Sequence, residues 1–351
     1  PLNLQLAADL VACGVDVAAV VESAPLFMPR RAGAVLRAAA ANPRLMAEGA
    51  VYVWRLMRSG IPVRTSHLAV RALGETRLEA VEIAPIDATG ERAGPVERFD
   101  ADALCLGYGF AAATEIAAAL GCRMDHDPRH LGTPSVVTDR DGATSVEGVF
   151  AIGDGARVAG AETALHAGQV VGAAVARFLG AKAPFPKRAA RSLARAQNFQ
   201  SALWSVFGAP PVRLDSIPDD TMLCRCEGIS FGVMRGEVHD GALSLAVLKR
   251  RLRLGMGRCQ GRVCTPIAAR LLSDITGRPV APSFAPRLPV KPFPAAALAF
   301  EKPEWGGHRR AGTPNLARPV PAEPCEPEAA DVVVIGGGVV GACLAYELAS
   351  A

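Results

Sequence analysis

Four cysteines constrain this chain more than any other feature of its sequence. Cys224 and Cys226 form a C-x-C pair, and Cys259 and Cys264 form a C-x4-C pair further along. A short segment with a helical pattern connects the pairs, so a small domain can bring four thiolates together. Four thiolates are enough to ligate both irons of a [2Fe–2S] cluster. Structural zinc usually takes C-x2-4-C pairs, which are wider than the first pair here. The spacing therefore favours iron–sulfur, with zinc or unliganded thiols as alternatives.

The residues around the second cysteine pair strengthen this interpretation. The run KRRLRLGMGRCQGRVC resembles the BFD-like (bacterioferritin-associated ferredoxin type) [2Fe–2S] domain carried by flavoprotein amine oxidoreductases. The resemblance implies that all four cysteines are metal ligands. Glycines at 255, 257 and 261 let backbone amides approach the sulfurs closely.

A basic cluster precedes the third cysteine. Nucleic-acid binding is not expected from it, because no aromatic residues are interleaved and it lies directly beside a ligand. Cations near an all-cysteine cluster offset its negative charge and adjust its potential, although a solvated helix face explains them almost equally well. The basic cluster consists of Lys249, Arg250, Arg251, Arg253 and Arg258.

Cysteine usage and charge bear on the compartment and on partners. Nine cysteines in 351 residues are an odd number without the density of a secreted disulfide scaffold, so a reducing cytoplasm is expected. The first residues lack a signal-peptide pattern, and no apolar run is long enough to cross a bilayer. Peripheral membrane association is left open. A formal charge of +4 is small for this length and does not indicate nucleic acid.

The chain begins with the pattern of a dinucleotide-binding α/β unit. A helix from Leu2 is followed by an expected strand at Val15–Val21, which ends at Glu22. In such a unit an acidic residue about twenty positions after the glycine turn binds the adenosine ribose. Glu22 lies where that residue belongs, although it is equally a charge closing any strand. Residues 1–105 are therefore predicted to be a partial Rossmann-like domain of the NAD(P)-binding type, with NAD(P) or another adenine nucleotide left open.

The next segments extend the α/β pattern. A long helix is expected over 31–59, β-rich segments over 63–73 and 78–86, and a buried strand over Asp102–Gly109. A second buried strand is expected at Gly148–Ile152, followed by the turn at Gly153 and Asp154 and an alanine-rich helix.

The sequence GVFAIGD before that helix resembles the second flavin-contacting motif of flavoproteins related to the pyridine nucleotide–disulfide oxidoreductases. The resemblance implies that residues 106–182 are the C-terminal part of an FAD-binding domain in which Asp154 accepts a ribityl hydrogen bond. The helix would direct its N-terminal amides, near Thr163, at the flavin. His166 on the same helix is interpreted as a packed or solvated histidine.

The rest of the chain divides by composition. Residues 183–220 form a helical connector, 221–278 the mainly helical BFD-like domain, and 279–330 a Pro-rich linker. Residues 331–351 restart an α/β pattern, because a strand at Asp331–Ile335 precedes a full G-x-G-x-x-G turn. This run resembles the FAD-binding start of the D-amino-acid-oxidase-like family, which implies pyrophosphate contacts for Gly336, Gly338 and Gly341.

The order of these parts resembles the subunits of the dye-linked L-proline dehydrogenase, opine oxidase and hydrogen cyanide synthase group. The resemblance implies a fragment of a fused polypeptide that oxidises the C–N bond of an amino acid, imino acid or opine and relays electrons through the cluster to an acceptor. Expected partners are the substrate, a redox acceptor or companion flavoprotein subunit, and further copies in an oligomer.

Several alternatives and open points accompany this prediction. The alternatives are a non-catalytic, ferredoxin-like electron-transfer module and an NAD(P)H-dependent reductase that feeds the cluster. Substrate, acceptor, oligomeric state, flavin retention and catalytic residues stay open. The cysteines Cys13, Cys105, Cys122 and Cys343 are expected to be small apolar core residues, and with Cys325 they form no paired spacing.

Overall fold

The structure, a computed structural model, describes residues 2–26, 28–110, 112–127, 133–210, 213–278, 280, 331–335 and 348. Two groups of predictions lie outside these residues. They are the Pro-rich linker with Cys325, and the glycine turn of Gly336, Gly338 and Gly341 with Cys343. The domain boundaries given above stay predictions.

The first part of the chain is a small α/β unit. Helix α1 (Leu2–Ala12) precedes strand β1 (Val20–Glu22), and β1 pairs in parallel with β2 (Val63–Thr65). The helices between these strands form the crossover that a parallel pair requires. Leu4, Ala8, Val20 and Leu56 form the buried core between helices and strands. The expected strand over Val15–Val21 is shorter and later than predicted, because only its last residues have a partner strand.

The predicted long helix over 31–59 is two helices. A 3-10 turn, η1 (Pro29–Arg31), leads into α2 (Ala32–Ala41), and α3 (Pro43–Arg58) follows after a break. Asn42 makes the break, since its side-chain Oδ1 accepts a hydrogen bond of 3.1 Å from the Leu45 amide. Pro43, at the first position of α3, has no amide hydrogen to continue α2.

Three strands form an antiparallel sheet; the first two lie in the predicted β-rich segments, and the third was not predicted. The order is β3 (His67–Leu73), β4 (Ala80–Pro85) and β5 (Glu97–Asp100). The central strand β4 is the most buried, with Ala80, Ile83 and Ala84 almost inaccessible.

Two predicted buried strands are wrong. The segment Asp102–Gly109 has no strand partner among the described residues and is largely exposed, including Leu106 and Tyr108. The segment Asp331–Ile335 is likewise irregular, with Val333 and Ile335 exposed. An apolar run becomes a parallel strand only where neighbouring strands and helices cover it. Cys105 and Cys13 are accordingly exposed, contrary to prediction, whereas Cys122 is buried as predicted.

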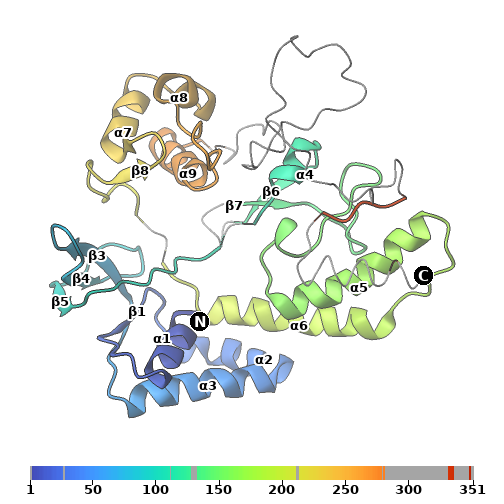
Figure 1. Ribbon diagram of the computed structural model, residues 1–351, viewed down its shortest axis with the longest axis horizontal. Helices are drawn as coiled ribbons and strands as arrows, with labels where there is room; N and C mark the ends of the chain where they lie inside the picture. Colours follow the sequence, from blue (N-terminus) through green and yellow to red (C-terminus); the bar gives the residue numbers. More distant parts are fainter. Residues whose placement is uncertain are drawn as a thin grey trace, which may run out of the picture.

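The middle of the chain contains the turn at Gly153 and Asp154 and the elements around it. Helix α4 (Glu115–Ala119) leads into the hairpin β6 (Met124–Asp127) and β7 (Thr133–Val136). The predicted strand Gly148–Ile152 is reduced to one bridge between Phe150 and Ala143, and the 3-10 turn η3 (Gly153–Gly155) follows. Helices α5 (Ala161–Phe178) and α6 (Lys187–Val206) lie along each other at the lower right of Figure 1. Helix α6 also packs on α2 through Phe199, Ala202 and Ala38.

The cysteine-bearing segment is a compact helical unit, at the upper left of Figure 1. A small hairpin of β8 (Met222–Cys224) and β9 (Ile229–Ser230) precedes α7 (Phe231–His239), α8 (Leu245–Leu252) and α9 (Cys264–Thr276). Ser230 and Ser244 cap α7 and α8 by accepting bonds of 3.3 Å from the amides of Val233 and Val247. The core is well packed and includes Met234, Leu248, Leu254, Leu271 and Leu272.

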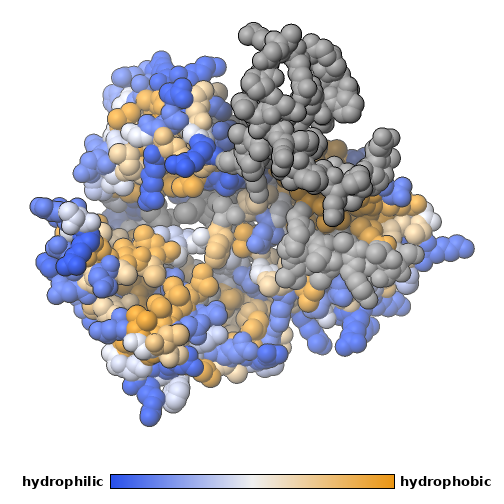
Figure 2. Space-filling model, viewed as in Figure 1, coloured by the Kyte–Doolittle hydropathy of each residue, from blue (hydrophilic) through white to orange (hydrophobic). Residues whose placement is uncertain are grey.

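The surface mixes charged and apolar areas. In Figure 2 apolar residues gather at the lower left, where α1 to α3 lie in Figure 1. Exposed apolar side chains of α3 include Trp54 and Met57. None of the described helices combines the length and apolar character that a membrane span needs.

Candidate functional site: two cysteine pairs beside a flavin-type turn

The structure brings the four cysteines of the sequence motif together. Cys224 ends strand β8 and Cys226 lies in the turn after it, whereas Cys259 lies in the loop after α8 and Cys264 begins α9. All four are free thiols, and the Sγ atoms of Cys226 and Cys259 are 3.8 Å apart. Two thiolates on one tetrahedral metal with bonds of about 2.3 Å lie at about that separation. Cys226 and Cys259 therefore have the spacing of two ligands on one metal.

The other two cysteines form a buried pair. Burial first, and then the charge and hydrogen bond of the neighbouring Cys224, raise the pKa of the Cys264 thiol to about 12. Cys224 and Cys264 are each at most 2% exposed, whereas Cys226 is exposed and Cys259 intermediate. Within the described ranges, no three His, Cys, Asp or Glu side chains surround a single point as one metal ion would require. The thiols thus differ in their surroundings: Cys224 and Cys264 form a buried inner pair, and Cys226 and Cys259 form a more exposed outer pair.

Backbone amides surround the outer pair. Burial opposes ionisation of Cys259, but hydrogen bonds from the amides of Gly261, Val263 and Arg262, together with the Cys226 thiol, lower its pKa. Gln260 and Gly261 have φ values of 52° and 78°, so this loop turns successive amides to one side. Such a nest of N–H groups stabilises negative charge. The loop is therefore built to hold a thiolate at Cys259.

A glycine allows the two cysteine loops to approach each other. A Cβ atom on Gly257 would lie 2.2 Å from Cys226 Cβ and 3.1 Å from its Sγ. Any other residue at this position would push Cys226 away from Cys259.

The predicted basic cluster is partly neutralised by carboxylates. Arg253 pairs with Glu227 at 2.8 Å, directly after Cys226, and Arg251 pairs with Glu237 at 3.0 Å. These contacts anchor α8 to the rest of the unit. They favour the solvated, ion-paired interpretation for these two arginines over direct contact with a cluster.

The flavin-type turn lies in the preceding segment. Asp154 is exposed in η3, and no hydrogen bond from the described residues reaches its carboxylate, which leaves it available to accept one. Its backbone oxygen accepts a bond of 2.8 Å from the amide of Ala113. Helix α5 packs against η3 and begins after Gly160, whose φ is 85°, with no side chain capping its first amides. Thr163 is buried in its first turn. An exposed acceptor and free helix amides fit a flavin ribityl chain and ring edge.

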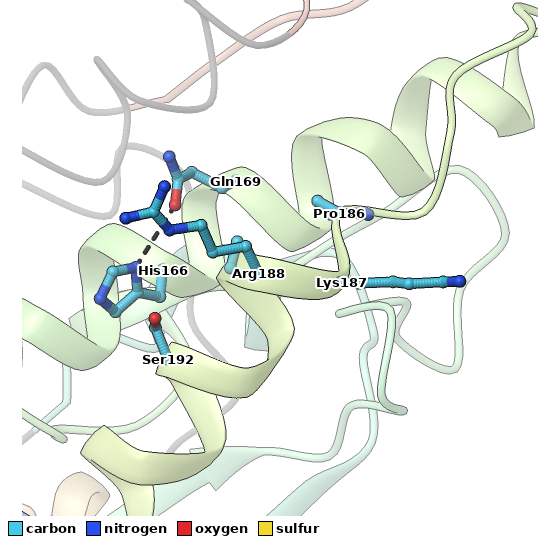
Figure 3. A pocket seen from close by; sticks show the side chains of 7 residues that line it. His166, Gln169, Pro186, Lys187, Arg188 and Ser192 are labelled. Atoms are coloured by element: carbon cyan, nitrogen blue, oxygen red, sulfur yellow. Dashed lines mark hydrogen bonds between the residues drawn. The ribbon is translucent and has the colours of Figure 1, made fainter.

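Glu22 and His166 lie apart from the cysteines in the sequence and in different elements. Glu22 ends β1 and is buried, and burial raises the pKa of its carboxyl. Its predicted ribose role stays a prediction. His166 lines an open hollow of about 500 Å³ between α5 and α6, and its Nδ1 is 3.3 Å from Gln169 Oε1. Figure 3 shows Lys187 extending away from the other residues of this hollow. Neither Asp154 nor a cysteine lines it.

Sequence reasoning missed one link between the two sites. Arg262, in the cysteine loop, forms an ion pair with Glu115 of α4. The two residues are 147 positions apart, and each alone has the pattern of an ordinary surface charge. No sequence signal identifies this contact.

Comparisons with known proteins identify several relatives of this chain. Residues 4–170 match the family described as pyridine nucleotide-disulphide oxidoreductase. The chain is 31% identical to the HcnB subunit of hydrogen cyanide synthase from Pseudomonas aeruginosa over 85% of its own length and 64% of that protein. It is 32% identical to an opine oxidase subunit of Rhizobium meliloti over 66% of its length and 44% of that protein. The chain therefore spans less than two thirds of these relatives.

A solved structure was also matched. The crystal structure of L-proline dehydrogenase from P. horikoshii aligns with 22% identity and a TM-score of 0.48, over 70% of this chain and 47% of that one. The predicted resemblance to the hydrogen cyanide synthase and opine oxidase subunits is confirmed by the sequence relatives.

Gly257 gives a direct test of the cysteine geometry. We expect Gly257→Ala to lower the metal held per purified chain, because its methyl group would overlap Cys226. Gly236→Ala on α7 is the matched control, since a Cβ there meets no atom within 4 Å. Elemental analysis of both variants measures the effect, and equal metal content in the two would contradict the close approach.

Proposed function

We propose that this relative of the hydrogen cyanide synthase and opine oxidase subunits is part of a flavin-dependent oxidoreductase that oxidises the C–N bond of an amino acid, imino acid or opine. The two related proteins are both named as subunits, so we include a companion subunit in the proposal. Residues 4–170 supply dinucleotide-binding architecture, with Asp154 accepting a ribityl hydrogen bond from FAD and the amides of α5 facing the flavin.

We further propose that Cys224, Cys226, Cys259 and Cys264 hold a [2Fe–2S] cluster. The observation that carries this proposal is the division of the thiols into an inner and an outer pair with a sulfur separation of 3.8 Å in the outer one. Each iron of an all-cysteine cluster takes two thiolates, whereas zinc takes four around one centre. When bound, such a cluster supplies one-electron transfer between a two-electron flavin and an acceptor.

The protein residues have separate tasks in this proposal. The amides of Gly261, Arg262 and Val263 offset the charge of the Cys259 thiolate. The apolar core around α9 keeps water from the inner pair, because Cys224 and Cys264 lie within it. The exposed Cys226 leaves one edge of the site open to solvent, where an acceptor can approach.

The cluster assignment predicts a defined composition. Purified full-length protein should contain about two irons and two acid-labile sulfides per chain. Cys226→Ser should lose most of both, because serine is a poor ligand for iron beside thiolates. Cys105→Ser, at an exposed cysteine outside the site, should keep them. Stoichiometric zinc without sulfide would refute the assignment.

Asp154 tests the flavin assignment. Asp154→Ala should weaken FAD binding by about 1.5–3 kcal/mol, the value of a hydrogen bond to a charged group. Asp16→Ala, at an exposed aspartate of the first α/β unit, should bind FAD as the wild type does. Equilibrium titration of the apoprotein measures both affinities. Unchanged affinity in Asp154→Ala would make this residue an ordinary turn aspartate.

The substrate class can be tested separately. We expect an opine or L-proline, added anaerobically to the intact protein with its companion subunit, to bleach the flavin absorbance. NADH is added in parallel, because the pyridine nucleotide family match also admits an NAD(P)H-dependent reductase. Bleaching by NADH alone would favour that reductase over amine oxidation.

A further inference from the structure

An ion pair joins the second cysteine loop to the segment before the flavin-type turn. Arg262 lies between Cys259 and Cys264, and its Nε donates to Oε1 of Glu115, the first residue of α4. The Arg262 side chain is 34% exposed and that of Glu115 is 20% exposed. A pair with this burial is screened less by water than an ordinary surface salt bridge, so its loss should lower the local stability of the segment that contains it.

Glu115 depends on this arginine. The second carboxylate oxygen, Oε2, is buried and has no hydrogen-bond partner in the part of the chain that the structure describes. A buried carboxylate without a cation is costly, because desolvation opposes its charge. Removing Arg262 therefore favours movement of the Glu115 side chain toward solvent, and we expect α4 to move with it.

The contacts continue from Glu115 to the flavin-type turn. The amide of Ala113, two positions earlier, donates to the backbone oxygen of Asp154 at 2.8 Å. Thr114, between them, is 4% exposed, so this short segment is held in place. On the other side, the Arg262 amide donates to the backbone oxygen of Cys259 at 3.1 Å, and it contributes to lowering the pKa of the Cys259 thiol. One run of contacts thus connects Asp154, Glu115, Arg262 and Cys259.

We propose that the Arg262–Glu115 pair docks the cysteine loop onto the flavin-type turn and so positions the metal site for electron exchange with the flavin. The inference rests on the cofactors proposed above for the two sites. Arg262 acts as a positioning residue, since its side chain pairs with Glu115 of α4. Electron transfer falls steeply with distance, so a contact that fixes the separation of the two sites fixes the rate.

Three other ion pairs of the cysteine unit lie within the unit. Arg251–Glu237, Arg253–Glu227 and Arg270–Asp274 each connect two residues of that unit. Arg270–Asp274 is an exposed pair one turn apart on α9, the same helix that Cys264 begins. It therefore provides a matched control for removing an arginine near the site.

Hydrogen exchange of α4 tests the docking without relying on activity. In the full-length protein, Arg262→Ala should speed exchange of the amides of Ala118 and Leu120 about tenfold, which corresponds to about 1.4 kcal/mol of lost local stability. Glu115→Gln should act in the same direction. Arg270→Ala should leave these amides unchanged. Arg262→Glu alone and Glu115→Arg alone should each remove this protection. The double variant with both changes, in which the two charges are exchanged, should restore much of it.

A second measurement tests the positioning. At equal iron and flavin content, the rate at which a reduced flavin reduces the metal site should fall in Arg262→Ala, because the two sites are no longer held at one separation. It should not fall in Arg270→Ala. Unchanged exchange in Arg262→Ala would overturn the docking. Faster exchange with an unchanged transfer rate would overturn the positioning role. A wild-type protein without iron would refute the proposed cluster, while exchange would still decide the docking.

Discussion

The structure of the cysteine unit depends on bringing into one small space four thiols that carry like charge when they ionise. Adjacent thiolates repel each other, and burial adds a desolvation cost to each. The fold places the two pairs in different surroundings. The inner pair is enclosed by the core, and burial beside Cys224 raises the pKa of Cys264 to about 12. The outer pair has amides and solvent around it, and the pKa of Cys259 is lowered. Without a metal, the Cys264 thiol is therefore neutral at physiological pH, and metal binding must release its proton.

The local elements of this unit follow from the sequence, because their causes are local. Ser230 and Ser244 precede apolar helical patterns and cap α7 and α8. Cys264 follows a glycine-rich loop and begins α9. The spacing of the cysteines was enough to predict that they meet. It did not predict which of them are buried, because that depends on how three helices pack.

The errors of sequence-based prediction have a common physical cause. Asp102–Gly109 and Asp331–Ile335 have the composition of buried parallel strands, but neither has a strand partner among the described residues. A parallel strand is defined by its partners on both sides and by the helices that cover it. The composition of a segment shows that it can be buried between strands and helices. It does not show that those strands and helices are there. The same argument explains Cys105, which was expected in a core and lies exposed.

The contact between Arg262 and Glu115 belongs to a class that one sequence does not reveal. Each residue alone resembles a solvated charge. The ion pair exists only because the cysteine loop and α4 contact each other in the folded protein. An ion pair also suits this position for a chemical reason. The thiolates beside Arg262 place negative charge near its loop, and an unpaired Glu115 facing that loop would be repelled. The guanidinium of Arg262 supplies the cation that offsets the charge of Glu115 beside this loop. An apolar contact could bury as much surface, but it would not offset this repulsion when the thiols ionise, so the charge of Arg262 matters more here than its size.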